Sequence, residues 1–183
     1  MMKSMNLPVT RLLATAVQQP ENGKLGKNLI KRLALMSVFV LSFFLSQAQV
    51  VEQKAMLAAM SDPNEVARLE SLISDLQPTA YISISDIKVY GESAPVCAEV
   101  DAAAVGRLAE SNSALAGVEL LTVRVAKNSD LGAVVDLSKL AAFTNLKYVQ
   151  IICEIECNPS QVANMVKNNS GAVKAFYIIS IPS

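Results

Sequence analysis

Three cysteines, Cys97, Cys153 and Cys157, are the side chains of this chain that could form a covalent bond or hold a metal ion. In an oxidising compartment, one disulfide would leave one thiol over. On a continuous strand, Cys153 and Cys157 would lie on one face about 13 Å apart, too far to bridge. The sequence therefore allows a disulfide from Cys97 to one of the other two, a turn that joins Cys153 to Cys157, or buried, unpaired thiols. With Glu154 or Glu156 beside them, their spacing matches no zinc pattern, so we expect no metal site.

Paired carboxylates are the second chemistry that the chain could carry out, because hydrolysis between two acids needs no histidine. The candidates are Asp86, Glu99, Asp101, Asp130, Asp136, Glu154 and Glu156. Asp101 and Asp136 are explained more simply as helix caps, and Glu154 with Glu156 as a solvated strand edge. Two of the acids about 5 to 10 Å apart in a cleft would indicate a hydrolase. Without evidence of such a pair, we expect no catalytic residue and predict that the protein is not an enzyme.

Histidine and tryptophan are absent from the sequence. The lack of histidine excludes Ser-His-Asp and Cys-His nucleophiles, His-Glu-x-x-His zinc sites and imidazole pH switches. The lack of tryptophan removes the strongest stacking platform for sugars and bases. The seven glycines form no phosphate-binding loop. We therefore expect no cofactor.

The apolar run over residues 33–45 is the clearest targeting signal in the chain. The basic pair at 31–32 precedes it, and Ser46 and Ala48 place small residues at positions −3 and −1 of a cleavage point. This layout is typical of a secretory signal peptide that is cleaved after Ala48. It predicts a secreted or periplasmic protein.

Other interpretations of the leader stay open. The apolar run falls short of the about twenty residues that a transmembrane helix needs, although residues 33–51 could act as an uncleaved membrane anchor. The segment before the basic pair, residues 1–30, is longer than the amino-terminal region of an ordinary signal peptide. Translation could therefore begin downstream of Met1, or the leader could be an organelle transit peptide.

The leader and the remaining chain differ in charge. Residues 1–48 hold 6 of the 16 basic residues and 1 of the 16 acids, which leaves 10 − 15 = −5 for residues 49–183. An acidic surface argues against nucleic acid and against anionic membranes as partners. Cleavage after Ala48 leaves a chain of the size of one domain, with no stable membrane span.

A helical segment is predicted at the start of residues 49–183. Residues 50–60 are rich in helix formers. A second helix is expected to begin at Asp62, with Pro63 at its first position and Glu65 completing a capping box. Apolar residues at helical spacing, the last of them Leu76, mark its buried face. The other residues of this face are Val66, Leu69 and Ile73, and the helix is expected to end before Pro78.

Short strands follow. Residues 81–90 are rich in β-forming residues, but the alternation slips at Ser85 and Asp86, which indicates a bulge or a tight turn. Residues 96–100 alternate as another strand.

From residue 101 the chain repeats a capped helical segment followed by a β-run. Asp101, Asp136 and Asn158 are the expected caps, and the runs cover 118–125, 146–152 and 173–179. The starts of the runs are almost evenly spaced, and their alignment matches Leu121 with Val149 and Phe176. A nearly fixed period of this length indicates stacked repeats.

The middle unit carries a more specific pattern, L-x-x-L-x-x-F-x-x-L-x-x-V-x-I, formed by Leu137, Leu140, Phe143, Leu146, Val149 and Ile151. Over residues 101–181 the chain resembles a short, degenerate leucine-rich-repeat protein of the kind that bacteria secrete. The resemblance implies an α/β fold in which a small parallel sheet and its returning helices form a half-solenoid. A general α/β domain with crossovers of similar length is the alternative, and both predict parallel strands with right-handed crossovers.

In a leucine-rich repeat, the solvent-facing side chains of the strands form the binding surface. The resemblance assigns this role to Glu119, Thr122, Arg124, Lys147, Tyr148, Gln150 and Tyr177. We therefore expect a non-enzymatic secreted or periplasmic module that binds a protein or a cell-envelope component through its sheet. The alternatives are a carboxylate-dependent hydrolase and a structural envelope protein that acts in assembly.

Overall fold

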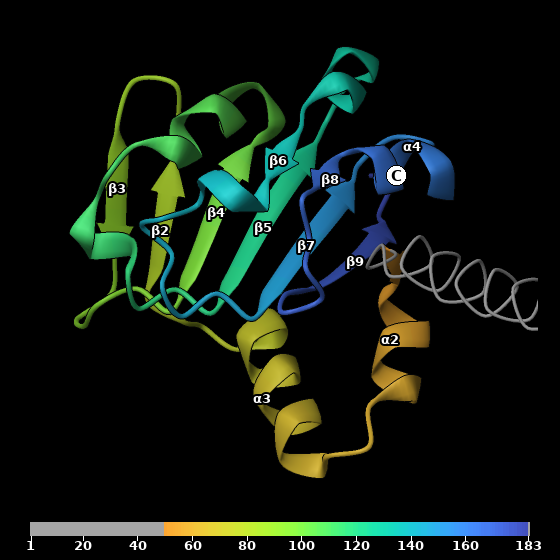
Figure 1. Cartoon of the computed structure of the whole chain (residues 1–183), viewed down its shortest axis with the longest axis horizontal. Helices are drawn as coiled ribbons and strands as arrows, with labels where there is room; N and C mark the ends of the chain where they lie inside the picture. Colours follow the sequence, from red (N-terminus) through yellow and green to blue (C-terminus); the bar gives the residue numbers. More distant parts are fainter. Residues whose placement is uncertain (1–49, 183) are drawn as a thin grey trace, which may run out of the picture. The chain divides into compact units, whose positions relative to one another are not determined.

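A seven-stranded sheet forms the centre of the part of the chain that the structure describes. The computed structural model describes residues 50–182, so the leader predicted over residues 1–48, with its cleavage point, lies outside the described residues. The strands are β1 (Val51–Glu52), β2 (Thr79–Ile82), β3 (Ile87–Tyr90), β4 (Cys97–Asp101), β5 (Leu120–Val125), β7 (Tyr148–Cys153) and β9 (Lys174–Ile179). Their order is β1-β9-β7-β5-β4-β2-β3, and all neighbours are parallel except β2 and β3 (Figure 1).

Strands β2, β4, β5, β7 and β9 lie side by side in the order in which the chain visits them. The predicted parallel arrangement is confirmed, and the described residues form an α/β fold with a mostly parallel sheet. Strand β1 departs from chain order, because it lies at the far edge and pairs with β9. Strands β1, β2 and β3 make the sheet wider than the small one expected.

The connections from β4 to β5, from β5 to β7 and from β7 to β9 cover one side of the sheet, which we call the inner face. They consist of the 3-10 helices η1 (Ala102–Ala109), η2 (Ser113–Leu115), η3 (Asn128–Gly132) and η4 (Leu137–Lys139), the α-helix α4 (Pro159–Asn164), and a two-stranded parallel sheet of β6 (Val135–Asp136) and β8 (Val166–Lys167). The expected α-helices are therefore mostly 3-10 helices. A 3-10 helix rises about 2.0 Å per residue, so it covers the same length with fewer residues than an α-helix.

Two of the three expected caps are confirmed. Asp136 Oδ1 accepts a hydrogen bond from the backbone N–H of Ser138 at 3.1 Å. Asn158 and Gln161 form a reciprocal capping box at 2.9 Å in each direction, with Pro159 at the first helical position. Asp101 precedes η1 but its side chain makes no capping hydrogen bond.

Alternate strand residues fill the inner face with apolar side chains. Those of the four central parallel strands are Ala98, Val100, Leu121, Val123, Val125, Val149, Ile151, Cys153, Ala175 and Tyr177. They pack in one buried cluster with Leu108, Leu115, Leu140 and Phe143 from the connections. The apolar residues of the pattern over 137–151 therefore all pack in or against this cluster.

The alignment of the third β-run was wrong by one residue. In the sheet, Leu121 pairs with Val149, but Val149 pairs with Ala175, and Phe176 pairs with Gln150. The third unit is therefore shorter than the second, counted between equivalent positions of the sheet. Because side chains alternate between faces, this slip places Tyr177 on the inner face.

The opposite side, which we call the outer face, is covered in part by α2 (Gln53–Ala59) and α3 (Pro63–Ser74). Their contacts with the sheet form a second buried cluster of Met56, Leu69, Leu72, Cys97, Leu120, Tyr148 and Phe176. Asp62 caps α3 by accepting a hydrogen bond from Asn64 N at 2.9 Å. Glu65, expected in a capping box, instead accepts hydrogen bonds from the Tyr148 hydroxyl at 3.0 Å and the Lys174 ammonium at 2.5 Å.

Helix α3 ends earlier than its apolar pattern predicts. Its last residue is Ser74, and Leu76, expected on the buried helix face, lies beyond the helix and is fully exposed. Asp75 already has extended backbone, with φ −90° and ψ 157°, whereas Pro78 disfavours helical backbone only at Gln77. The segment from Asp75 to Pro78 crosses from the helix to β2.

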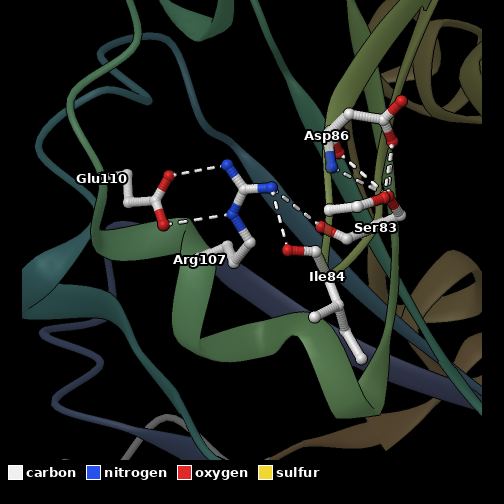
Figure 2. Close-up of polar contacts among 6 residues, drawn as sticks. Ser83, Ile84, Asp86, Arg107 and Glu110 are labelled. Atoms are coloured by element: carbon white, nitrogen blue, oxygen red, sulfur yellow. Dashed lines mark hydrogen bonds and ion pairs between the residues drawn. The ribbon is translucent and has the colours of Figure 1, made fainter.

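Strands β2 and β3 form an antiparallel hairpin, so the slip predicted at Ser85 and Asp86 is a tight turn. The Ser83 hydroxyl donates to Asp86 Oδ1 at 2.6 Å within this turn. Figure 2 shows that Arg107 of η1 reaches the turn and donates to the carbonyl oxygens of Ser83 and Ile84, at 3.1 and 3.2 Å. The same guanidinium holds Glu110 at 3.0 and 2.8 Å. Arg107 therefore fixes the hairpin to the neighbouring connection.

Gly91 directly follows β3 and lies against Pro78, in the segment that follows α3. Its backbone has φ +117°, which L-residues rarely adopt, and a Cβ there would lie 2.9 Å from Cα and Cβ of Pro78. The close approach requires glycine. It holds the end of β3 against the chain that leads into β2.

Candidate functional site

The outer face is divided into a covered and an open half. Near the strands' amino ends, Cys97, Leu120 and Tyr148 lie in register under α3 and are buried. Further along, the open half carries Tyr81, Glu99, Asp101, Arg124, Ile152 and Ile178, none of which is fully buried. The carboxyl ends of the strands therefore present a mixed charged and apolar surface.

A pocket of about 600 Å³ lies where the open half meets the end of α3 and the β2–β3 hairpin. We call it the outer-face pocket. Its floor is formed by Cys97, Ala98, Glu99, Leu120, Thr122, Gln150 and Ile152, and its walls by Leu72, Ile73, the segment 75–79, Tyr81 and the segment 90–92. A concave site with apolar walls and a few polar groups is the usual form of a binding site.

Two tyrosines form one wall of the pocket. Tyr81 of β2 and Tyr90 of β3 meet edge to face, with ring centroids 5.5 Å apart and an interplanar angle of 83°. They are 44% and 58% exposed, although aromatic rings are usually buried more completely. Leu76, also in the wall, is fully exposed. These three side chains form an apolar rim open to solvent.

A short hydrogen-bonded chain supports the pocket floor. Thr122 Oγ1 donates to Gln150 Oε1 at 3.2 Å, and Gln150 Nε2 donates to Gln53 Oε1 of α2 at 3.0 Å. Both Thr122 and Gln150 are buried. Because their polar atoms are satisfied within the fold, they position the sheet against α2.

Arg124 of β5 lies between the carboxylate of Glu99, on the neighbouring strand β4, and that of Glu154, which directly follows the other neighbour, β7. Its Nη1 donates to Glu99 Oε1 at 2.9 Å, and its Nη2 contacts Glu154. The two carboxylates raise the pKa of the guanidinium, Glu99 having the larger effect. The guanidinium therefore occupies the space between the two acids, which a hydrolase would need for its substrate.

The other acids in the candidate hydrolase set lie in structural positions. Asp86 binds Ser83 within the hairpin turn, and Asp130 accepts from the backbone N–H groups of Ala126 and Lys127, each at 3.2 Å. Asp136 caps η4, while Asp101 and Glu156 are exposed. Among the described residues of this set, Glu99 and Glu154 are the two acids that share an ion-pair partner, Arg124.

The seven residues predicted as a solvent-facing binding surface divide into three groups. Thr122, Arg124, Tyr148 and Gln150 do lie on the outer face, but only Arg124 is open to solvent, since Tyr148 is 1% exposed beneath α3. Glu119 and Lys147 precede their strands and pair with each other at 3.0 Å. The assignment of Tyr177 to this surface was wrong, because it packs in the inner core.

Sequence reasoning missed Leu76, Tyr81 and Tyr90, which dominate the pocket rim. Tyr81 and Tyr90 could have been placed together from the hairpin, because a turn at 83–86 pairs Tyr81 with Lys88 and puts Tyr90 on the same face. For Leu76 the sequence predicted burial instead of exposure, since its spacing fits the buried side of a helix.

Glu119 is the centre of an ion-pair group that attaches α3 to the sheet. Its carboxylate accepts from Arg68 of α3 at 2.6 Å and from Lys147 at 3.0 Å. The hydrogen bond from Arg68 lowers the pKa of the Glu119 carboxyl most, burial raises it, and the bond from Lys147 lowers it further. The result is a pKa below the ordinary value of 4.5.

This lowered pKa predicts a loss of stability in acid. A carboxyl whose pKa is lower in the folded state stabilises the fold above its unfolded pKa, and this contribution disappears as the pH falls through the folded value. We expect the fall in Tm between pH 7 and pH 3 to be smaller in Glu119→Gln than in the wild type, by about 3 to 6 °C. Circular dichroism melts would measure it. Glu70→Gln, an exposed acid on α3, is the control and should behave like wild type.

The three cysteines are free thiols. Cys97 lies on the outer face and Cys153 in the inner core, so the sheet separates them and excludes the disulfide between these two that the sequence allowed. Burial raises the pKa of the Cys97 thiol to about 11. Burial and a hydrogen bond with Cys157 raise the pKa of the Cys153 thiol to about 12. Cys157 is only half-buried.

These environments predict selective alkylation. In the reduced, folded chain, iodoacetamide at pH 8 should modify Cys157 and leave Cys97 and Cys153 largely unmodified, because the thiolate is the reactive form. In about 6 M guanidinium all three should react. Mass spectrometry of the full chain would count the adducts, with Cys157→Ser as the control that should give none when folded. Rapid modification of Cys97 in the folded chain would contradict the prediction.

Comparison of the chain with protein-family models, curated protein sequences and solved structures gives no match. Within residues 50–182, no cluster of three or more histidine, cysteine, aspartate or glutamate side chains is arranged to hold a metal ion. None of the described helices has the length and apolar character needed to cross a bilayer.

Proposed function

We propose that the protein is a secreted or periplasmic, non-enzymatic interaction module that binds a protein of the cell envelope or its surroundings. The binding surface is the open half of the outer face together with the outer-face pocket. The leader over residues 1–48 supports the location, because its layout is that of a secretory signal. The observation that carries the binding role is the exposed apolar rim of Leu76, Tyr81 and Tyr90 beside a pocket of about 600 Å³.

Exposed large apolar side chains that gather around a concave site favour binding over a purely structural explanation. Single exposed apolar residues are ordinary, whereas a contiguous group next to a pocket marks a place where a partner is bound. Here the group is held in place on both sides. Arg107 fixes the hairpin turn, and the contact of Gly91 with Pro78 fixes the other end. A pre-organised surface loses less conformational entropy on binding.

A leucine-rich-repeat-like half-solenoid is the interpretation of the fold that accompanies this proposal. Strands in chain order and 3-10 connections on one side both suit it. The spacing of equivalent residues is uneven, since the step from Ala98 to Leu121 is shorter than the steps to Val149 and Ala175. Helices α2 and α3 also cover half of the face on which the repeats would bind, so binding is confined to the other half.

A hydrolase is less well supported. Glu99 and Glu154 are the acids of that set which lie close together, and the guanidinium of Arg124 is bound to both. The guanidinium therefore fills the space in which a paired-acid hydrolase would hold its substrate between the two acids.

Site-specific photo-crosslinking tests the proposed surface. The full chain carrying p-benzoylphenylalanine in place of Tyr81 would be produced in its native host, illuminated, and recovered from the envelope fraction and the medium. We expect a discrete crosslinked species from position 81. The same residue in place of Lys139, exposed on η4 on the opposite side of the sheet, is the matched control and should give none. Equal crosslinking from both positions, or none from position 81, would overturn the proposal.

A further inference from the structure

The outer-face pocket is large enough to take one long side chain together with the backbone around it. Its volume is about 600 Å³, and its walls come from three separate segments, the end of α3, the hairpin and the sheet. The hairpin wall is held by Arg107 and Gly91. The site is therefore formed before any partner arrives.

The charge of the pocket selects the kind of side chain. Asp75, Glu92 and Glu99 line it, and none of the described residues that line it is a lysine or an arginine. Glu99 is bound to Arg124, but that guanidinium is shared with Glu154, so the group of three still carries one excess negative charge. Within residues 50–182, Asp75 and Glu92 belong to no ion pair. A cation is the charge that this environment favours.

The aromatic wall favours a cation for an independent reason. Tyr81 and Tyr90 meet edge to face and remain 44% and 58% exposed, so ring surface is available to a ligand. The face of an aromatic ring attracts an ammonium or guanidinium group within about 6 Å of its centre. Leu72, Ile73 and Leu76 line the same pocket and can contact an aliphatic stem. A long stem with a charged end is the structure of a lysine or arginine side chain.

We infer that the outer-face pocket binds a lysine or arginine side chain presented by the protein partner. The inference rests on the proposed function and names the chemistry of its partner. The exposed Leu76 supports a macromolecular source over a free amine, because a small cation would leave this leucine uncovered. The partner's residues on either side of the basic side chain cover the rim.

Fluorescence anisotropy with a defined peptide tests this inference on the full chain. The probe is a dye-labelled Gly-Leu-Arg-Lys-Leu-Gly peptide, blocked at both ends, and its neutral counterpart carries citrulline and acetyl-lysine in place of the two bases. We expect saturable binding of the basic peptide and about tenfold weaker binding of the neutral one. Free butylammonium should compete only weakly.

Variants of the pocket locate the binding. Asp75→Asn combined with Glu92→Gln should weaken binding of the basic peptide by about 5- to 20-fold, and Tyr90→Leu by about 2- to 10-fold. Glu70→Gln removes an exposed acid of α3 outside the pocket and should leave the affinity within about twofold. Circular dichroism would verify that each variant is folded.

The inference would be overturned by equal affinity for the two peptides, by unchanged affinity in the variant at positions 75 and 92, or by no saturable binding of the basic peptide. Butylammonium that binds as tightly as the peptide would also overturn it, in favour of a small amine. Failure of the proposed function looks different. If position 81 gives no crosslink but the peptide still binds in a charge-dependent way, the proposed function alone is contradicted. If the crosslink persists in the variant at positions 75 and 92, the inference alone is contradicted.

Discussion

Replacement of Phe176 by alanine is expected to lower the free energy of unfolding by about 3 to 5 kcal/mol. Phe176 is 0% exposed and lies on the outer face of β9, in the cluster that also contains Met56 of α2. Its removal takes away a large buried apolar surface and leaves a cavity between the sheet and the helix. Urea unfolding followed by circular dichroism would measure the change.

Ile179 provides the matched control for Phe176, because it lies on the same strand and is 44% exposed. Ile179→Ala should change the free energy of unfolding by no more than about 0.5 kcal/mol. A loss of less than about 1 kcal/mol in Phe176→Ala would show that α2 does not pack on β9 as the structure has it.

Replacement of Gly91 by alanine is expected to cost about 2 to 4 kcal/mol of stability. Two effects add here. Alanine is strained at φ +117°, and its Cβ would lie 2.9 Å from backbone and side-chain carbons of Pro78. The proline ring has little freedom to move away. We also expect weaker crosslinking from position 81, because the same contact holds the hairpin wall of the outer-face pocket.

Gly106→Ala is the control for this substitution. A Cβ at Gly106, within η1, would meet nothing within 4 Å. The change should be neutral or stabilise the fold by about 0.4 to 1 kcal/mol, since alanine restricts the unfolded chain. Thermal melts of the two variants would decide, and equal destabilisation by both would contradict the structural reason given for Gly91.

Local signals in the sequence predicted most of the parallel strands and the starts of several helices. Predicted runs over 118–125 and 146–152 correspond to β5 and β7, and the slip at Ser85 and Asp86, which indicated a bulge or a tight turn, is a turn. These features depend on alternation, turn residues and capping side chains, which act within a few residues. For the same reason they could be seen without knowledge of the rest of the chain.

The register of the last strand could not be predicted from such local signals. Lys174 to Ile179 contains apolar residues at both parities, so either Ala175 or Phe176 could face the inner core. The structure places a small residue, Ala175, inward and gives the larger Phe176 to the space under α2. Packing against an element far away in the sequence decides the choice.

The candidate site was only partly predictable for a related reason. The resemblance to leucine-rich repeats implied an open strand surface, and Arg124 does lie there. Coverage of Tyr148 and Gln150 depends on where α2 and α3 dock, which no pattern within the strands reveals. The pocket arises at the junction of α3, the hairpin and the sheet, and therefore belongs to none of them singly.

The pairing of β1 with β9 has a consequence for how the chain folds. Val51 and Phe176 are neighbours in the sheet although they lie near opposite ends of the described chain. In an open array of repeats, each unit contacts only its neighbours, and the last unit can unfold alone. Here the last long strand is held by the first one and by α2, so it cannot fray without loss of both. Folding must therefore close a very long loop, and we expect the unfolding of β9 to be coupled to that of β1 and α2.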